Sequence, residues 1–226
     1  MKLLIGNHNY STWSMRPWLF VHYHELPVEV ICMELFSDDL LQTLEPHFSD
    51  GKVPLLLDGK FEVWDSIAIM EYLGERFPES ASWPTNREAR AVARAVSAEM
   101  HSSFSVLREE APMNIRKRFP GYELSKQALK EVSRIQNIWR HCRNNYGANG
   151  PWLFGDFSIA DAMYAPVVMR FRSVQVDLDE TSQNYCNTIN QCESVIRWID
   201  QAYQEQGVVD ADEIDWPGES IPPRSV

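Results

Sequence analysis

Residues 52–77 read KVPLLLDGKFEVWDSIAIMEYLGERF, and this stretch decides the fold of the first third of the chain. Residues 53–57 are an apolar strand candidate, and residues 61–64 return as a second strand after an Asp-Gly turn signal. Residues 65–77 then carry apolar side chains at helical spacing. The sequence therefore predicts a β-hairpin that leads directly into a helix.

The residues before this hairpin predict a βαβ unit. Residues 2–5 form a short strand candidate, residues 14–24 a helix, and residues 28–35 a second strand rich in β-branched side chains. A short helix or turn is expected at residues 40–44. Two strands joined in this way run parallel through a right-handed crossover. The first 80 residues are thus predicted to form an α/β domain with the element order βαβ-ββα.

The pattern changes after residues 78–86, PESASWPTN, which have the composition of a linker. Beyond them, apolar residues at helical spacing predict helices at residues 89–107, 124–146, 158–171 and 184–203. The final stretch, residues 210–226, has five acidic residues and three prolines, and either wraps the surface or stays loose. The predicted organisation is an α/β domain at 1–78, a linker at 79–87, an all-helical domain at 88–206 and a tail at 207–226.

Composition and charge exclude several classes of protein. The 226 residues include 32 acidic and 21 basic side chains, a formal net charge of -11. Nucleic-acid binding and attraction to an anionic membrane both need a basic face, which this sequence does not offer. The apolar run near the N-terminus is too short for a signal-peptide core, and no stretch approaches the roughly 20 apolar residues that span a bilayer. We therefore expect a cytoplasmic protein.

The four cysteines stand alone at positions 32, 142, 186 and 192. Scattered thiols favour a reducing compartment. They form no C-x-x-C pair, and no Cys/His group has the spacing of a zinc site. The sequence thus predicts no bound metal.

The first candidate site lies in residues 9–14, NYSTWS, between the first strand and the first helix. The hydroxyls of Ser11, Thr12 and Ser14 lie beside free backbone N–H groups and the positive end of a helix dipole. Such a place favours an anion, including a thiolate, although one hydroxyl could simply cap the helix. A nucleophilic serine needs a base held nearby, and no Ser/His/Asp arrangement is present, which disfavours a hydrolase.

Two dipeptides further along the chain are further candidates. If the Val53-Pro54 bond is cis, Val53 can turn its N–H and C=O toward an extended peptide-like ligand; otherwise Pro54 is an edge-strand proline. Asp65 and Ser66 either cap the helix that they open or hold an amino acid, with Asp65 on its ammonium and Ser66 on its carboxylate. The S-x-x-D pattern at 158–161 resembles a structural capping box.

Together these stretches resemble the cytosolic glutathione transferase superfamily over residues 2–205. The resemblance rests on YSTWSMR at 10–16, KVPLL at 52–56, DSIAIMEYL at 65–73 and PWLFGDFSIADAMYAP at 151–166. It implies a thioredoxin-like N-terminal domain followed by an all-helical domain. The loop that opens with Ser11 looks serine-type and closest to the zeta class, as in zeta-like bacterial members. Trp13 stands where the zeta motif has a cysteine, which makes an isomerase chemistry that uses this cysteine less expected.

The resemblance also implies a glutathione site. Ser11 is implied as the hydroxyl that activates the glutathione thiol, with Thr12 and Ser14 as alternates. Further glutathione-binding residues implied in this way are Lys52, Val53, Pro54, Asp65 and Ser66, with Val53 at the cysteinyl backbone and Asp65 and Ser66 at the γ-glutamyl end. Candidates for the pocket of the second substrate are Met100, His101, Phe104, Arg108 and Met113.

The activity implied is a conjugating, detoxifying glutathione transferase. Glutathione is the co-substrate, no metal is needed, the partner is a small electrophile, and the protein is a homodimer. Arg16 or Arg108 could recognise an acidic substrate. Two alternatives stay open: a glutathione-dependent isomerase or dehalogenase, and a non-catalytic partner-binding protein of the same fold.

Overall fold

The computed structural model describes residues 1–222. The N-terminal part of the chain forms a four-stranded β-sheet. Its strands are β1 (Lys2–Ile5), β2 (Glu29–Cys32), β3 (Leu55–Asp58) and β4 (Phe61–Trp64). Their order in the sheet is β2-β1-β3-β4. β1 runs parallel to β2 and antiparallel to β3, while β3 and β4 form a hairpin. The predicted βαβ-ββα order is confirmed, although the second strand is shorter than residues 28–35.

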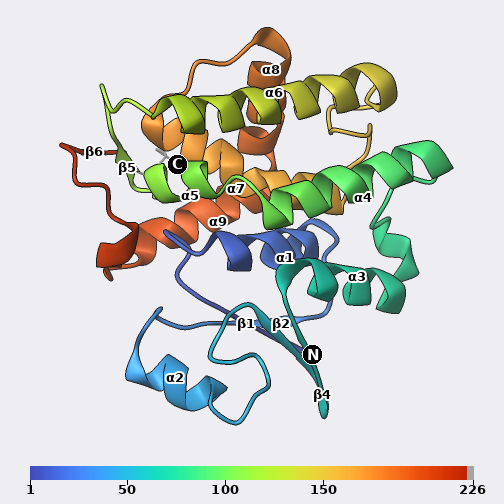
Figure 1. Cartoon of the computed structure of the whole chain (residues 1–226). Helices are drawn as coiled ribbons and strands as arrows, with labels where there is room; N and C mark the ends of the chain where they lie inside the picture. The colour runs from blue at the N-terminus through green and yellow to red at the C-terminus, as the bar shows by residue number, and fades with distance from the viewer. Residues whose placement is uncertain (223–226) are drawn as a thin grey trace.

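Helices cover both faces of this sheet (Figure 1). They are α1 (Thr12–Tyr23), α2 (Asp38–Leu44) and α3 (Ser66–Arg76). Alternate side chains of a strand point to opposite faces. Accordingly, Leu3 joins the large core that contains α1 and α3, whereas Leu4 packs against Leu40 and Leu44 of α2. Helices α1 and α3 therefore lie on the face of the sheet that is directed toward the second half of the chain.

The second half is helical. It contains α4 (Arg87–Ser102), α5 (Ser105–Glu110), α6 (Lys126–Tyr146), α7 (Ile159–Val174), α8 (Glu180–Gln191) and α9 (Glu193–Gln204), with 3-10 turns at η1 (Pro78–Ser80) and η2 (Asp210–Asp212). Helix α7 is buried almost throughout and contacts α1, α4 and α8. The α/β domain thus packs through α1 against the centre of the helical domain, and the predicted fold class is confirmed. The residue limits of the domains, linker and tail stay a prediction.

Two predicted helices are each broken in two. The helix expected at 89–107 ends at Ser102, because buried Phe104 adopts a left-handed backbone with φ 62° before α5 begins. The helix expected at 184–203 divides at Cys192, whose backbone is extended. The helical spacing of apolar residues continues across both breaks, because the two helices on either side of each break bury side chains in the same core.

The capping box that the sequence predicts at residues 158–161 is present at the start of α7, and it is buried. Asp161 accepts hydrogen bonds from the Ser158 backbone N–H at 2.9 Å and from the Leu153 N–H at 3.0 Å. The Tyr185 hydroxyl donates to the same carboxylate at 3.1 Å. This carboxylate therefore fixes the loop before α7 and links it to α8.

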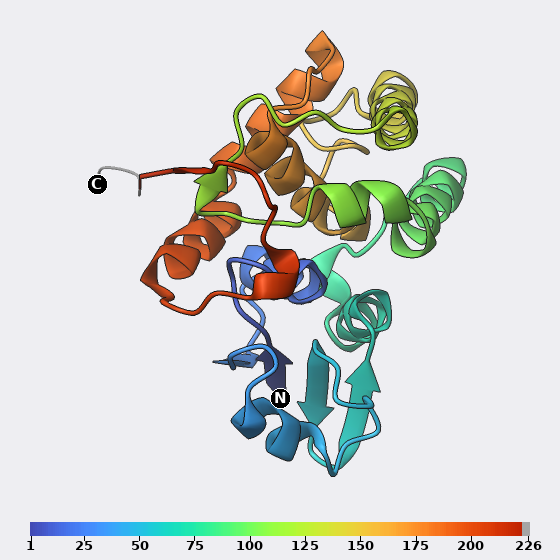
Figure 2. The ribbon, with the colours of Figure 1, turned by 60° about the vertical axis from the view of Figure 1, so that its left-hand side comes forward.

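The tail wraps around the surface (Figure 2). Strand β6 (Glu219–Ser220) pairs antiparallel with β5 (Lys117–Arg118), a short addition to the helical domain. Glu213 accepts hydrogen bonds from Tyr10, Asn114 and Lys117. The predicted tail at 207–226 extends to residues 223–226, which lie outside the described residues. In residues 1–222, every helix is too short or too polar to span a bilayer.

Candidate active site

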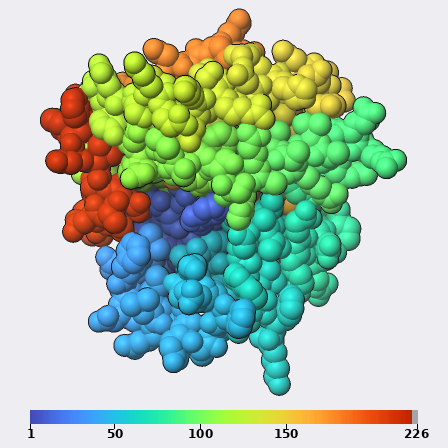
Figure 3. Space-filling view, in the orientation of Figure 1, coloured from blue at the N-terminus to red at the C-terminus, as the bar shows by residue number. Residues whose placement is uncertain are grey.

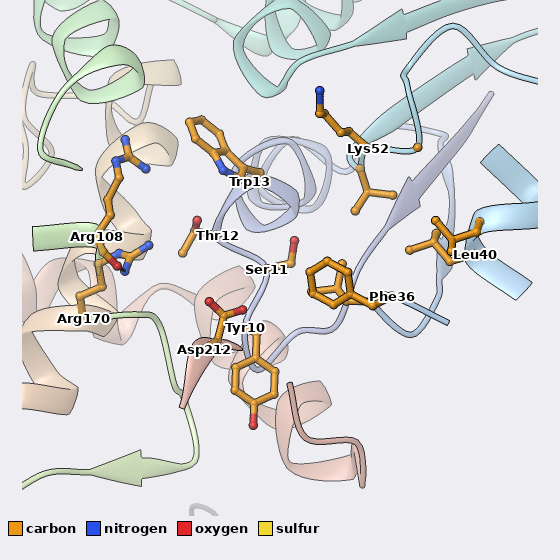
Figure 4. Close-up of a pocket in the computed structure, with 14 residues that line it drawn as sticks. Tyr10, Ser11, Thr12, Trp13, Phe36, Leu40, Lys52, Arg108, Arg170 and Asp212 are labelled. Carbon is orange, nitrogen blue, oxygen red and sulfur yellow. Dashed lines mark hydrogen bonds between the residues drawn. The ribbon is translucent and has the colours of Figure 1, made fainter. Parts of the chain in front are cut away.

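A cavity of about 390 Å³ opens between the two domains. In the space-filling view its floor is the recessed N-terminal segment, framed by the loop before α2, the helical domain and the tail (Figure 3). Figure 4 shows the side chains around it. Its lining residues are Tyr10, Ser11, Thr12, Trp13, Leu35, Phe36, Leu40, Leu41, Gly51, Lys52, Val53, Arg108, Arg170 and Asp212. We call this the hydroxyl cavity.

A second cavity, of about 410 Å³, adjoins the first. We call it the carboxylate cavity, and it is lined by Trp13, Lys52, Val53, Pro54, Trp64, Asp65, Ser66 and His101. Trp13, Lys52 and Val53 line both cavities. Val53 therefore borders both the cavity that Ser11 lines and the cavity that Asp65 lines.

Ser11 is the N-cap of α1 and lines the hydroxyl cavity. Its Oγ accepts from the Ser14 backbone N–H at 3.4 Å and lies 2.8 Å from Ser14 Oγ, to which it can donate. The Ser14 hydroxyl in turn accepts from the Gly6 N–H at 3.0 Å. Thr12 also lines the cavity, whereas Ser14 is fully buried and lines neither. Capping and exposure to a ligand thus coexist at Ser11.

Asp65 is the N-cap of α3 and adopts a positive φ of 76°, which is uncommon for a non-glycine residue and more frequent for Asp. Its Oδ1 accepts from the Ile67 N–H at 2.9 Å, while its Oδ2 lies 2.6 Å from His101 Nε2 on α4. The neighbouring Ser66 hydroxyl is fully buried and has no hydrogen-bond partner among residues 1–222. The N-terminus of α3 thus presents an unpartnered hydroxyl at the lining of the carboxylate cavity.

The segment between the two cavities precedes β3. The Val53-Pro54 peptide bond is cis. Lys52 is largely exposed, and its Nζ lies 3.1 Å from the Asp50 carboxylate. The five glutathione-binding residues that the resemblance implies after Ser11 therefore all line the carboxylate cavity.

Two guanidinium groups lie over the ring of Trp13. Arg16 lies 4.2 Å and Arg108 4.9 Å from the centroid of its ring, within the range of cation–π attraction. Arg16 is fully buried, and its burial, together with Arg108 and Arg170, lowers its pKa. Arg108 and Arg170 line the hydroxyl cavity and make its wall basic, with Asp212 as the acidic residue of the same lining.

Arg170 on α7 reinforces this wall. Its guanidinium donates to the backbone carbonyls of Arg108 and Ala111. Burial, followed by the charge of Arg108, lowers the pKa of Arg170, while Asp212 opposes this effect. A cation so buried is held by carbonyl oxygens on one side and faces the cavity on the other.

The five residues predicted for the second-substrate pocket divide into two groups. Arg108 lines the hydroxyl cavity, and His101 lines the carboxylate cavity beside Asp65. Met100, Phe104 and Met113 are buried in the main core and line neither cavity. Their roles stay predictions.

Sequence reasoning missed several lining residues, above all Arg170 and Asp212. Arg170 interrupts the apolar run VVMRF, and a charge in such a run is the signal that could have revealed it. Asp212 comes from the tail, whose path no local pattern indicates.

Tyr10 and the cysteines do not compete with Ser11. The Tyr10 hydroxyl donates to Glu213 Oε1 at 2.6 Å, and burial, with Glu213, raises its pKa. The four cysteines all lie within the described residues, and none lines either cavity. Burial raises the pKa of Cys142 and Cys186 to about 12, and partial burial of the sulfur, with the nearby Glu205 carboxylate, does the same for the otherwise exposed Cys32, so these thiols stay protonated near neutral pH. A nucleophilic sulfur in this site must come from a ligand.

Comparisons with known proteins fit this arrangement. The sequence model of the glutathione S-transferase N-terminal domain matches residues 10–76, and that of the C-terminal domain matches residues 91–201. Together they cover most of the chain.

Individual relatives are more distant. A dichloromethane dehalogenase of Methylophilus leisingeri is 52% identical over 59 residues, which are 26% of this chain and 22% of the relative. A stringent starvation protein A homolog of Pasteurella multocida is 28% identical over 151 residues, 66% of this chain and 64% of the relative. The chain thus spans less than two thirds of the length of these curated relatives.

A solved structure supports the fold along nearly the whole chain. A glutathione transferase homolog from Burkholderia, with bound glutathione, superimposes with a TM-score of 0.67 at 24% identity and covers 91% of this chain and 98% of that one. With the two domain matches and the two-domain fold, the chain belongs to the glutathione S-transferase family.

Proposed function

We propose that this protein is a glutathione transferase in which the Ser11 hydroxyl stabilises the glutathione thiolate for attack on a small electrophile. One observation carries the proposal. Val53 lines both cavities, with Ser11 lining one of them and Asp65 and Ser66 the other. An extended tripeptide along Val53 can therefore reach from the Ser11 hydroxyl to the N-terminus of α3.

The carboxylate cavity suits the γ-glutamyl end of glutathione. The Asp65 carboxylate can accept from the ammonium, and the unpartnered Ser66 hydroxyl can donate to the carboxylate of that end. Free N–H groups at the start of α3 favour the same negative charge. The exposed Lys52 ammonium, at the border of both cavities, supplies a further positive charge.

Ser11 acts as a hydrogen-bond donor and keeps its proton. In the free protein the Ser11 hydroxyl donates to Ser14 Oγ. When the thiolate binds, both hydroxyls rotate, so that Ser14 donates to Ser11 Oγ and still accepts from the Gly6 N–H, and the Ser11 proton bonds to the thiolate. Free thiols have a pKa near 8.5. A charge-assisted hydrogen bond contributes roughly 1.5–3 kcal/mol, equivalent to about one to two pKa units. The positive end of α1 acts in the same direction, and much of the bound thiol is then ionised at neutral pH.

The second substrate occupies the hydroxyl cavity. Bound glutathione supplies the sulfur. As the thiolate forms the new S–C bond, the carbon gives up the electron pair of a π bond, which is then protonated, or that of its bond to a leaving group, which departs to solvent. Arg108 and Arg170 on the cavity wall favour an electrophile that carries a carboxylate or another anionic group.

Dehalogenation is the second candidate function. The 52% identity over 59 residues to a dichloromethane dehalogenase favours it. In that reaction the same thiolate displaces a halide and forms an S–C bond, so the first step needs the same residues. Water then cleaves the S–C bond, which returns glutathione and releases the oxygenated carbon product. Halide release from a halogenated substrate, with glutathione regenerated unchanged, would identify the dehalogenase, whereas a stable thioether product would identify the conjugating enzyme.

We also propose a cytoplasmic homodimer. Phe48 and Trp64 of the α/β domain are 76% and 45% exposed, and their rings lie 5.0 Å apart, a pair of apolar side chains suited to a subunit contact. Light scattering should give twice the mass of the chain, and Phe48→Ser should lower it toward one chain. Scattered reduced thiols favour the cytoplasm.

The first test is a pH titration of the ultraviolet absorbance of the thiolate of glutathione bound to the protein. We expect an apparent thiol pKa about one to two units below that of free glutathione. Ser11→Ala should return it toward the free value and should lower turnover more than glutathione affinity. Thr12→Val is the matched control, because it removes a second hydroxyl of the same cavity and should leave the pKa lowered.

Three outcomes would contradict the mechanism. An unshifted pKa in the wild type would mean that the site holds glutathione without activating it. A lowered pKa that survives in Ser11→Ala would transfer the role to another group. Absence of glutathione binding would favour the non-catalytic, partner-binding alternative.

A further inference from the structure

Three atoms that can each bind a metal ion lie close together beside the loop that precedes α1. They are Nδ1 of His8, Sγ of Cys32 and Oε1 of Glu205. His8 Nδ1 lies 2.9 Å from Glu205 Oε1 and 3.6 Å from Cys32 Sγ, and the sulfur lies 4.0 Å from the same oxygen. The residues come from the loop after β1, the last position of β2 and the residue that follows α9.

This cluster is separate from the candidate active site. His8 and Cys32 line a cavity of about 370 Å³ whose other lining residues are Trp18, His22, Val30, Arg197, Asp200 and Gln201. None of these residues lines the hydroxyl or the carboxylate cavity. The cluster therefore needs an explanation independent of glutathione.

We propose that His8, Cys32 and Glu205 form a binding site for a zinc-like divalent metal ion. A tetrahedral zinc ion lies about 2.0–2.1 Å from nitrogen, about 2.3 Å from sulfur and about 2.0–2.2 Å from oxygen, which separates its ligand atoms by roughly 3.4–3.6 Å. Of the three observed separations, 2.9 Å is shorter than this range, 3.6 Å lies at its upper limit and 4.0 Å is longer. Small side-chain movements bring all three atoms onto one ion.

The geometry argues against a catalytic triad. In a Cys-His-Glu triad the thiol and the carboxylate bond to different nitrogens of the imidazole. Here Cys32 and Glu205 both approach Nδ1 of His8. That nitrogen carries one proton or one lone pair, so it cannot bond fully to both. Three atoms that converge on one point are the arrangement that a metal ion needs.

Two of the ligands are already held in place. The Glu205 carboxylate accepts from the His8 backbone N–H at 2.5 Å and from the Asn9 N–H at 3.0 Å. The His8 ring packs 4.4 Å from the Trp198 ring, and its side chain is only 8% exposed. Such outer contacts orient metal ligands. Cys32 is exposed and supplies the third ligand from the cavity side.

The donor set selects the class of ion. A thiolate and an imidazole suit zinc and similar transition metals, whereas Mg²⁺ and Ca²⁺ prefer oxygen ligands alone. On binding, the Cys32 thiol loses its proton to solvent and the Sγ–metal bond forms. Three protein ligands leave a fourth position for water. Arg197 lines the cavity but is paired with Glu193, which offsets its repulsion of a cation.

Cobalt(II) is a direct probe, because a thiolate bound to it absorbs in the near ultraviolet. Full-length protein, reduced and freed of metal with a chelator, is titrated with Co²⁺. We expect a thiolate-to-cobalt band that saturates at one ion per chain, that Zn²⁺ abolishes and that Mg²⁺ leaves unchanged. Zn²⁺ should also raise the melting temperature, because the ion joins three separate segments.

Cys32→Ser is the decisive variant, since the position is exposed and the His8–Glu205 contact remains. It should abolish the band and weaken Co²⁺ binding by at least about tenfold. Cys192→Ser, which changes another incompletely buried thiol outside the cluster, should leave the band intact. A second variant, Glu205→Gln, should weaken binding with the thiol still present. No band in the wild type, or a band that persists in Cys32→Ser, would overturn the proposal.

Discussion

Nε2 of His101 lies 2.6 Å from Oδ2 of Asp65, so a side chain of α4 in the helical domain reaches the N-terminus of α3 in the α/β domain. Oδ1 of the same carboxylate caps α3 through the Ile67 N–H. Both oxygens of Asp65 are therefore engaged in the free protein. An incoming ammonium has to share Oδ2 with His101 or displace it.

Removal of His101 should strengthen glutathione binding. Asp65 is already oriented by the helix that it caps. His101→Ala therefore removes the group that competes with the ammonium for Oδ2 and leaves the carboxylate fixed in position. Both side chains are about one third exposed, and a solvent-accessible contact of this kind contributes up to about 1 kcal/mol, so the dissociation constant should fall by at most about fivefold. Isothermal titration calorimetry measures it, with His141→Ala as control. A weaker complex would instead make His101 part of the glutathione site.

Ser14→Ala should destabilise the protein and also raise the thiol pKa of bound glutathione. The Gly6 N–H loses its acceptor in a fully buried place, which lowers the free energy of unfolding by about 1–3 kcal/mol. Urea unfolding measures the loss, and Ser133→Ala on an exposed face of α6 should show almost none. If Ser14 orders the Ser11 hydroxyl, the thiol pKa should rise less than in Ser11→Ala; an unchanged pKa would show that Ser11 acts alone.

Glu213→Ala should affect the second substrate more than glutathione. Glu213 accepts from Tyr10 Oη at 2.6 Å and from Asn114 Nδ2 at 3.0 Å, and so fixes the Tyr10 side chain in the lining of the hydroxyl cavity. We expect a severalfold rise in KM for the electrophile and an unchanged dissociation constant for glutathione. Asp215→Ala, an exposed neighbour, should change neither. Equal losses for both ligands would indicate a general loss of structure.

The buried carboxyl group of Asp161 should make the protein less stable as the pH rises. Burial raises the pKa of Asp161 to about 6, against hydrogen bonds from Leu153 and Ser158 that lower it. Between the unfolded value near 3.9 and 6, the folded chain holds a proton that the unfolded chain has lost, so this contribution to stability disappears as pH rises through 6. It amounts to about 3 kcal/mol at most.

Urea unfolding of the wild type and Asp161→Asn at pH 4.5 and 6.5 isolates this contribution, because all other groups titrate alike in both proteins. The variant should be less stable overall, since an amide places a donor against the Ser158 N–H. Its stability should nevertheless decrease less between the two pH values. An equal decrease in both proteins would mean that Asp161 does not titrate in this range.

Local patterns predicted much of the α/β domain, because its elements follow one another closely and each has its own signal. The hairpin of β3 and β4 has an Asp-Gly turn, and α3 has Asp65 as its cap. The helices around Phe104 and Cys192 were predicted as continuous because burial repeats on both sides of each break. The spacing of apolar residues indicates which face of a helix is buried, but it does not indicate where the helix ends and the backbone turns.

Contacts between distant residues left no such signal. His8 and Cys32 are 24 positions apart, and His8 and Glu205 are 197 apart, so no metal-ligand spacing relates them. Arg170 reaches the hydroxyl cavity only because α7 packs beside α1. Tertiary structure brings these side chains together, and a search of neighbouring residues cannot find them.

The hydrogen bond between Tyr10 and Glu213 joins residues 203 positions apart. The entropy of loop closure disfavours such a contact until intervening segments have folded and brought its ends together. We therefore expect both domains to form their cores first and the tail to dock last. During folding, the protein reaches a native core before the electrophile side of its site is complete.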